Sequence, residues 1–169
     1  MEMLILVDKD DKEVDYKEKE SCHLRPATLH RAFSIFIVNS KRQMLIHKRQ
    51  VTKKTWPGFW TNACCSHPRK DEDLKQATKR RLQEELGVVC SITPLFKFYY
   101  KADYDEKYGE HEVDHVFLGI YDGEVKQNDD EIQEHKFVPM DELVRDVRIH
   151  GCYYTPWFKQ GLPNVLRYL

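Results

Sequence analysis

The segment His30–Val38 is largely apolar, so a strand formed by it would be apolar on both of its faces. Such strands are typical of sheets that are buried on both sides. A polar run at residues 39–42 follows, and residues 44–47 are apolar again, which together predict a hairpin. We therefore expect two central strands joined by a tight turn.

Residues 71–86 predict an amphipathic helix. Its apolar face contains residues at four-residue spacing and one neighbour, namely Leu74, Ala77, Thr78, Leu82 and Leu86. The helix should start after Asp71 and stop at Gly87, because glycine commonly follows the last turn of a helix.

Further elements alternate along the second half of the chain. Strand-like patterns cover residues 95–100 and 113–121, and helical patterns cover residues 140–145 and 157–169. We expect Pro163 to interrupt the last helix, because proline lacks the backbone N–H group that a helix interior needs. The order of elements predicts a mixed α/β class.

One domain over residues 1–169 is the simplest organisation. The sequence contains no internal repeat, no low-complexity tract and no linker rich in Pro, Gly and Ser. A chain of 169 residues is long enough to bury a substantial core. The longest charged run, residues 8–20, predicts an N-terminal loop or exposed turn.

The composition argues against polyanionic partners. The chain has 27 basic and 28 acidic residues and a net charge of -1, so it has no overall field to attract nucleic acid or an acidic membrane. The first apolar run ends at Asp8, too early for a membrane span, and the acidic N-terminal region is untypical of a transit peptide. Five cysteines, an odd number, fit free thiols in a reducing compartment. We expect a cytoplasmic protein.

Two pairs of reactive side chains repeat a two-residue spacing. Cys65 and His67 form the first pair, and Glu110 and Glu112 form the second. Side chains two residues apart share one face of an extended segment. A thiol, an imidazole and two carboxylates could therefore line one cavity, which indicates an enzyme.

The acidic pair has two interpretations. On a strand, Glu110, Glu112 and Asp114 would share a face, where like charges repel unless a cation or solvent intervenes. A bound metal ion would remove this repulsion. The alternative is a solvated strand edge whose charges prevent aggregation.

Three histidines could complete a metal site. His23, His30 and His67 offer imidazole nitrogens, which together with carboxylates suit zinc, manganese or a similar divalent ion. His23 and His30 are seven residues apart and would lie on opposite faces of a straight strand, so we expect a bend between them at Pro26. Taken singly, each histidine is more typical of a structural or exposed residue than of a metal ligand.

The predicted helix carries a further signal. Arg81 and Glu85 are four residues apart, and an ordinary surface ion pair is the simplest interpretation. Residues 80–88, however, resemble the signature helix of the Nudix superfamily, whose glutamates bind a divalent cation on a diphosphate substrate. Arg81 stands where hydrolytic members carry a glutamate, and Ser66 stands where their motif begins with a glycine.

Several dispersed motifs resemble the type I isopentenyl diphosphate isomerases. The motifs are His23-x6-His30 and residues 53–62, 65–68 and 110–113. The resemblance extends to residues 154–157 and so covers nearly the whole chain. It implies a Nudix-like α/β/α sandwich with a mixed sheet. It also implies conversion of isopentenyl diphosphate into dimethylallyl diphosphate by adding a proton at one carbon and removing one from another.

The same resemblance implies two metal ions. The five residues that would hold one divalent ion, Mn²⁺, Zn²⁺ or Mg²⁺, are His23, His30, His67, Glu110 and Glu112. Glu85 would help to hold Mg²⁺ on the substrate's diphosphate, which agrees with the usual oxygen ligands of this ion. Arg49, Lys53 and Arg81 would form the cationic cradle for the diphosphate.

The implied catalytic residues surround the reacting carbons. Cys65 and Glu112 would be the two proton-transfer groups on opposite sides of the substrate, with Tyr100 hydrogen-bonded to the carboxyl group. Trp157 would offer its ring face to the developing carbocation. Cys64 should point to the opposite face from Cys65. The other cysteines are expected to be buried structural thiols, and they are Cys22, Cys90 and Cys152.

Two other functions remain open from the sequence. A Nudix hydrolase of a nucleoside or prenyl diphosphate is favoured by Glu84 and Glu85, but Arg81 argues against it and it leaves Cys65 without a role. A non-catalytic metal-binding or regulatory domain is the other alternative. The competent side chains at every matched position argue against that one.

Overall fold

The computed structural model describes all 169 residues, and its strands form one nine-stranded mixed sheet. The strands are β1 (Met3–Val7), β2 (Glu13–Glu18), β3 (His30–Val38), β4 (Gln43–Arg49), β5 (Trp60–Thr61), β6 (Cys64–Ser66), β7 (Ile92–Asp103), β8 (Gly109–Ile120) and β9 (Ile132–Pro139). The helices are α1 (Lys19–His23), α2 (Leu74–Leu86), α3 (Met140–His150) and α4 (Pro156–Val165), with short 3₁₀ turns at Gly151–Tyr153 and Leu166–Tyr168.

Strand β3 is the centre of the sheet. It pairs along its whole length with β8 in parallel orientation, and β8 in turn pairs antiparallel with β7. The opposite edge of β3 is shared in succession by β1, β6 and β4. The predicted hairpin with β4 is confirmed, although only Ile37 and Val38 of β3 pair with it before the strands diverge.

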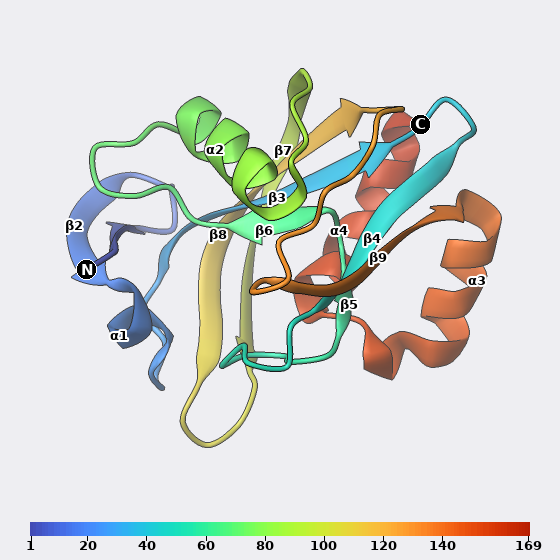
Figure 1. Cartoon of the computed structure of the whole chain (residues 1–169). Coiled ribbons are helices and arrows are strands. Elements are labelled where there is room, and N and C mark those ends of the chain that lie inside the picture. Colours follow the sequence, from blue (N-terminus) through green and yellow to red (C-terminus); the bar gives the residue numbers. More distant parts are fainter.

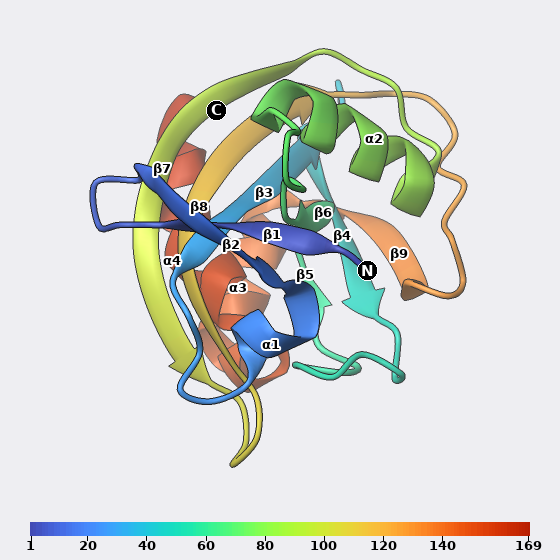
Figure 2. The ribbon, with the colours of Figure 1, turned by 90° about the vertical axis from the view of Figure 1, so that its left-hand side faces the viewer.

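Alternate side chains of β3 enter two separate cores. Phe36 and Val38 pack in a core that includes residues of α4, whereas Ile35 and Ile37 pack in a core that includes residues of α2. Figure 1 shows α2 in front of the sheet and α4 behind it, and the turned view in Figure 2 agrees with this arrangement. The predicted α/β/α sandwich with a mixed sheet is therefore confirmed.

Local interactions set the ends of α2. Asp73 and Gln76 form a capping box, in which the Asp73 carboxylate accepts the backbone N–H of Gln76 at 2.7 Å. Gly87 ends the helix with φ of 62°, a left-handed conformation that favours glycine. The predicted helix and its end are confirmed, and its first residue is Leu74 rather than the residue after Asp71.

The expectation of a loop over residues 8–20 is wrong for most of that segment. Only the turn at residues 8–12 matches it. Strand β2 follows and pairs antiparallel with β1, with Met3 opposite Glu18, and α1 begins at Lys19. The side chains of β2 are exposed or half-buried, because the strand lies at the edge of the sheet, so its sequence is polar.

Four other elements are longer or more regular than expected. Strands β7 and β8 extend beyond the predicted ranges and form a long hairpin, visible at the bottom of Figure 1, and α3 continues to His150. Pro163 does not interrupt α4, which continues to Val165. Pro163 and Lys159 lie on the exposed side of α4, so water can reach the carbonyl that lacks an N–H partner.

All five cysteines are unpaired. The expected burial holds for Cys22, but Cys90 is half-buried and Cys152 is exposed, so the prediction of a buried thiol is wrong for Cys152. No helix has the length and apolar character needed to cross a membrane.

Candidate active site

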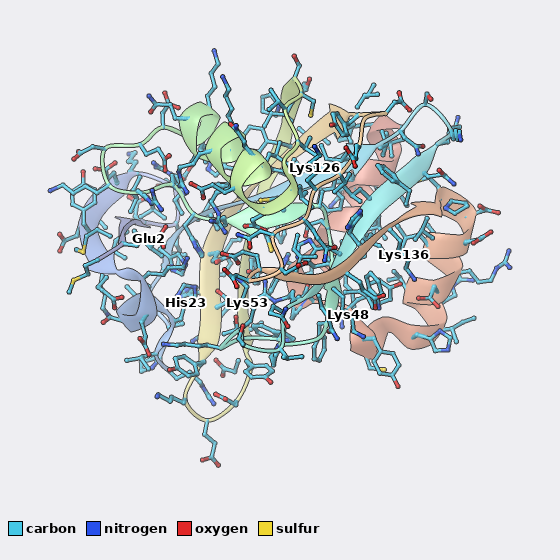
Figure 3. All side chains as sticks on the ribbon, in the orientation of Figure 1. Glu2, His23, Lys48, Lys53, Lys126 and Lys136 are labelled. Carbon is cyan, nitrogen blue, oxygen red and sulfur yellow. The ribbon has the colours of Figure 1, made fainter.

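One cavity of about 420 Å³ brings most of the predicted site residues together. The predicted residues that line it are His23, Arg49, Lys53, Cys65, His67, Arg81, Tyr100, Glu110, Glu112 and Trp157. His23 is the last residue of α1, and Lys53 lies in the loop after β4. Figure 3 shows both residues below α2. His30 and Glu85 are buried and do not line the cavity, and each contacts a residue that does.

The three histidines and two glutamates form a compact cluster. One potential ligand atom from each of the five residues lies within 4.8 Å of all the others. The parallel register of β3 and β8 places His30 beside Glu112, with His30 Nε2 3.3 Å from Glu112 Oε1. His67, just after β6, approaches the same oxygen at 2.8 Å, and His23 Nε2 lies 3.0 Å from Glu110 Oε2.

The backbone orients two of these imidazoles. The Nδ1 atom of His23 is 2.7 Å from the carbonyl of Lys19, and that of His30 is 2.7 Å from the carbonyl of Thr28. These contacts leave Nε2 of both rings directed at the glutamates. The expected bend between His23 and His30 is present, since α1 ends at His23 and the chain passes Pro26 before β3 begins.

The cluster fits a divalent metal ion. Two buried atoms, His30 Nε2 and Glu110 Oε2, make no hydrogen bond of suitable geometry. Each nevertheless lies close to an atom that is itself a potential metal ligand, namely Glu112 Oε1 at 3.3 Å and His23 Nε2 at 3.0 Å. Burial alone would lower the pKa of His23, but Glu110 and Glu112 outweigh it and raise this pKa to about 9. The site therefore attracts positive charge, and its imidazole and carboxylate donors suit zinc, manganese or a similar ion.

The alternative of a solvated strand edge is wrong. Strand β8 lies between β3 and β7, and Glu110, Glu112 and Asp114 are all buried. Asp114 is not part of the metal cluster. Its carboxylate accepts a hydrogen bond from Ser34 at 2.7 Å, and burial and the neighbouring acids hold its pKa well above the usual range.

Strand β6 separates the two adjacent thiols. Cys65 is opposite Ser34 of β3 and points into the cavity, whereas Cys64 packs in the core beneath α2. Burial raises the pKa of Cys65 to about 12, even though the nearby Arg49 guanidinium, with Nη1 3.7 Å from Sγ, acts in the opposite direction. Cys65 is therefore a protonated thiol at neutral pH.

The pKa of Glu112 is shifted in the opposite direction to that of Cys65. The antiparallel register of β7 and β8 places Tyr100 directly across from Glu112, and the Tyr100 hydroxyl donates to its carboxylate. Burial alone would raise the pKa of Glu112, but the interactions with His30 and Tyr100 outweigh it and lower the pKa. The cavity thus contains a thiol with a raised pKa and a carboxylate with a lowered pKa.

Trp157 forms an aromatic wall of the cavity. Its indole N–H donates to Thr61 Oγ1 at 2.9 Å, and Trp56 packs against it at 88° with ring centres 5.4 Å apart. The Arg49 guanidinium lies 5.2 Å from the centre of the Trp157 ring. This ring is held in one orientation and already faces a positive charge.

Arg49 and Arg81, two of the three predicted diphosphate-binding cations, have different partners. Arg49 is buried and donates to the carbonyl oxygens of Thr55 and Trp56. Arg81 forms the predicted ion pair with Glu85, but this pair is largely buried and is no ordinary surface pair.

Sequence reasoning did not identify Thr55 and Glu131. Thr55 donates to the metal-cluster residue Glu110 at 2.9 Å and so fixes the orientation of that carboxylate. Glu131 forms ion pairs with both Lys53 and Arg81. Its position in the acidic run at residues 129–131 resembles an exposed loop, and no sequence signal connects it with the two distant cations.

Comparisons with known proteins agree with this geometry. The NUDIX domain model matches residues 28–158. The chain is 40% identical to Isopentenyl-diphosphate Delta-isomerase 1 of Photorhabdus laumondii, over 99% of this chain and 96% of that protein. It is 36% identical to Isopentenyl-diphosphate Delta-isomerase of Pectobacterium atrosepticum, over 98% of this chain and 92% of that protein.

A solved structure supports the fold alone. The crystal structure of the MutT protein from Methanosarcina mazei Go1 has a TM-score of 0.66 and 20% identity, and it covers 83% of this chain and 94% of that chain. With the nearly full-length sequence similarity and the Nudix domain match, the conclusion is that the chain belongs to the Nudix superfamily and, within it, to the isopentenyl-diphosphate Delta-isomerases.

Proposed function

We propose that the cavity interconverts isopentenyl diphosphate and dimethylallyl diphosphate by proton transfer through Cys65 and Glu112. The observation that carries this assignment is that the Cys65 thiol, whose pKa is raised, and the Glu112 carboxylate, whose pKa is lowered, line the same cavity. The reaction adds a proton to the terminal alkene carbon and removes one from the carbon that precedes the branched carbon. One group gives the first proton and the other accepts the second, so no redox step is needed.

The surrounding residues meet the other requirements of this reaction. Tyr100 holds the Glu112 carboxylate in position, and Trp157 faces the branched carbon on which positive charge develops. The hydrocarbon part of the substrate excludes water when it fills the cavity, which protects the carbocation-like state from attack.

We assign two metal ions to the site. His23, His30, His67, Glu110 and Glu112 would hold Mn²⁺, Zn²⁺ or Mg²⁺, and this ion would set the proton affinity of the Glu112 carboxyl group. Glu85 would hold Mg²⁺ on the diphosphate, because a carboxylate and phosphate oxygens are its preferred ligands. Arg49, Lys53 and Arg81 would bind the diphosphate oxygens. The proposed catalytic, metal-binding and diphosphate-binding residues lie between His23 and Trp157, and we assign the whole range 1–169 to one domain.

We place the reaction in the cytoplasm. A reducing compartment keeps Cys65 in its thiol form, which the proposed proton transfer requires.

Lys53 should give the reaction a pH limit. Burial lowers its pKa from 10.5 to about 8, so the ammonium loses its charge as the pH rises through about 8. We expect kcat/KM to fall above this pH, because kcat/KM reports the free enzyme. Lys53→Arg keeps its charge and should shift the decline to higher pH. The same decline in both proteins, measured from about pH 6 to about pH 10, would assign it to another group.

Proton NMR of the metal-loaded protein with isopentenyl diphosphate and magnesium in deuterated water tests the proposed function. We expect signals of dimethylallyl diphosphate and incorporation of solvent deuterium. Release of phosphate or pyrophosphate would instead indicate the hydrolase. An unchanged substrate in the presence of bound metal would indicate a non-catalytic metal-binding domain.

A further inference from the structure

One carboxylate joins two of the cations that line the cavity. Glu131 Oε2 contacts the ammonium of Lys53, and Glu131 Oε1 lies 3.2 Å from Nη2 of Arg81. The same Nη2 atom contacts Glu85 Oε1, so both carboxylates share one guanidinium nitrogen. Glu131 does not itself line the cavity, but it touches the charged ends of two residues that do.

The position of Glu131 is fixed by the backbone of neighbouring segments. Its carbonyl accepts the N–H of Gln50 at 3.0 Å, and its N–H donates to the carbonyl of Asn128 at 3.0 Å. The N–H of Asn128 in turn donates to the carbonyl of Glu85 at 2.8 Å. The loop before β9 is thus tied both to the loop that carries Lys53 and to the end of α2, so the backbone from which the carboxylate extends is held independently of its ion pairs.

The charges at this end of the cavity balance. Three cations line this end, Arg49, Lys53 and Arg81. Three carboxylates pair with them, because Arg81 contacts Glu84, Glu85 and Glu131, and Glu131 also contacts Lys53. The other lysines that line the cavity do not change this balance, because each has its own acidic partner. These pairs are Lys19 with Glu2 at 2.9 Å and Lys54 with Glu20 at 2.6 Å.

A site without excess positive charge favours one form of the substrate. An ionised diphosphate monoester carries about three negative charges, and its magnesium complex carries about one. The complex would therefore bring about one uncompensated negative charge into the site, whereas the free diphosphate would bring about three beside Glu131 and Glu85. Like charges brought together in this way are a common means of rejecting a wrong ligand.

We propose that Glu131 makes the cavity selective for the magnesium complex of a diphosphate ester over the free diphosphate. It does so by keeping one negative charge between the ends of Lys53 and Arg81, where only a ligand that brings its own cation is well compensated. This inference rests on the proposed function, because it takes the diphosphate to bind at these cations.

Calorimetric titration with methyl diphosphate tests the inference without turnover. The protein is loaded at the His/Glu cluster, dialysed free of magnesium, and titrated with and without added Mg²⁺. We expect the wild type to bind the magnesium complex more tightly. Glu131→Gln should reduce this preference about tenfold, mainly through tighter binding of the free diphosphate, because one nearby unit charge has been removed.

Two variants serve as matched controls. Glu131→Asp keeps the charge and should keep most of the preference. Glu134→Gln removes a charge three residues away, from an exposed side chain that faces Lys48 at 3.6 Å, and should leave the preference unchanged. Figure 3 shows Lys48 apart from Lys53 and His23, toward β9.

Three results would overturn the inference. The first is an unchanged preference in Glu131→Gln, and the second is an equal loss of affinity for both ligand forms, as expected of a purely structural cross-link. The third is a wild type that binds both forms equally well, a result that needs no variant. Isomerase assays on the same samples keep the two proposals separate. An inactive wild type whose preference for the magnesium complex is nevertheless reduced in Glu131→Gln would contradict the proposed reaction and support the role of Glu131.

Discussion

Cys65→Ser should lower kcat of the isomerase by about 10³-fold or more, whereas Cys64→Ser should keep most of it. The Cys65 side chain points into the cavity, and its thiol carries a transferable proton. A serine hydroxyl in the same place is a much weaker acid and a poorer proton-transfer group. The measurement is the initial rate of dimethylallyl diphosphate formation with both metals supplied.

Cys64 is the matched control because it is the adjacent residue with the same side chain. Its thiol is fully buried beneath α2, so Cys64→Ser places a hydroxyl in an apolar core and should cost about 1–3 kcal/mol of stability. We expect a lower melting temperature and a nearly normal kcat for the folded protein. An active Cys65→Ser together with an inactive Cys64→Ser would show that the roles of the two thiols are reversed.

The parts of the fold that were predictable from the sequence are those with strong local signals. The apolar run of β3 required burial on both faces, and its alternate side chains indeed enter two cores. The end of α2 was predictable because Gly87 adopts a left-handed conformation that other residues avoid. Its start was less certain, because Asp71 and Asp73 are both suitable capping residues and only the contact with Gln76 decides between them.

The errors arose where tertiary context decides. Strand β2 is polar because it lies at the sheet edge, and its pairing with β1 cannot be inferred from its own residues. Pro163 is tolerated in α4 because it lies on the exposed side near the end of that helix.

For the candidate site too, local spacing was predictable from the sequence and contacts between distant segments were not. Two-residue spacing was enough to place Glu110 and Glu112 on one face of a strand. It could not show that β3 runs parallel to β8, which is what brings His30 to Glu112. Family resemblance supplied that connection. Glu131 remained unnoticed because its two partners are 50 and 78 residues away in the chain.

Trp157→Ala should remove nearly all activity, and Trp157→Phe should lose less. An indole ring that faces a desolvated cation stabilises it by about 2 kcal/mol or more. Loss of that stabilisation in the carbocation-like state corresponds to a rate roughly 30-fold lower. Phenylalanine keeps a weaker aromatic face, and alanine has none. Trp157 is suited to this role because Thr61 and Trp56 hold its ring at the cavity wall.

A lower rate alone would not separate this role from core packing, because Trp157 is also part of the core that contains α4. A diphosphate analogue with a tertiary ammonium in place of the cationic carbon distinguishes cation stabilisation from core packing. It mimics the carbocation-like state and should bind much more tightly than the substrate. We expect its affinity to fall in the order wild type, Trp157→Phe, Trp157→Ala, while the affinity for a neutral analogue of the same shape changes little.

Trp60 lies outside the cavity with Lys136 4.3 Å from its ring centre, so Trp60→Phe should leave both affinities unchanged. Equal loss of both affinities in Trp157→Ala would assign this tryptophan to packing, because only an electrostatic contact distinguishes a charged ligand from a neutral one of equal size.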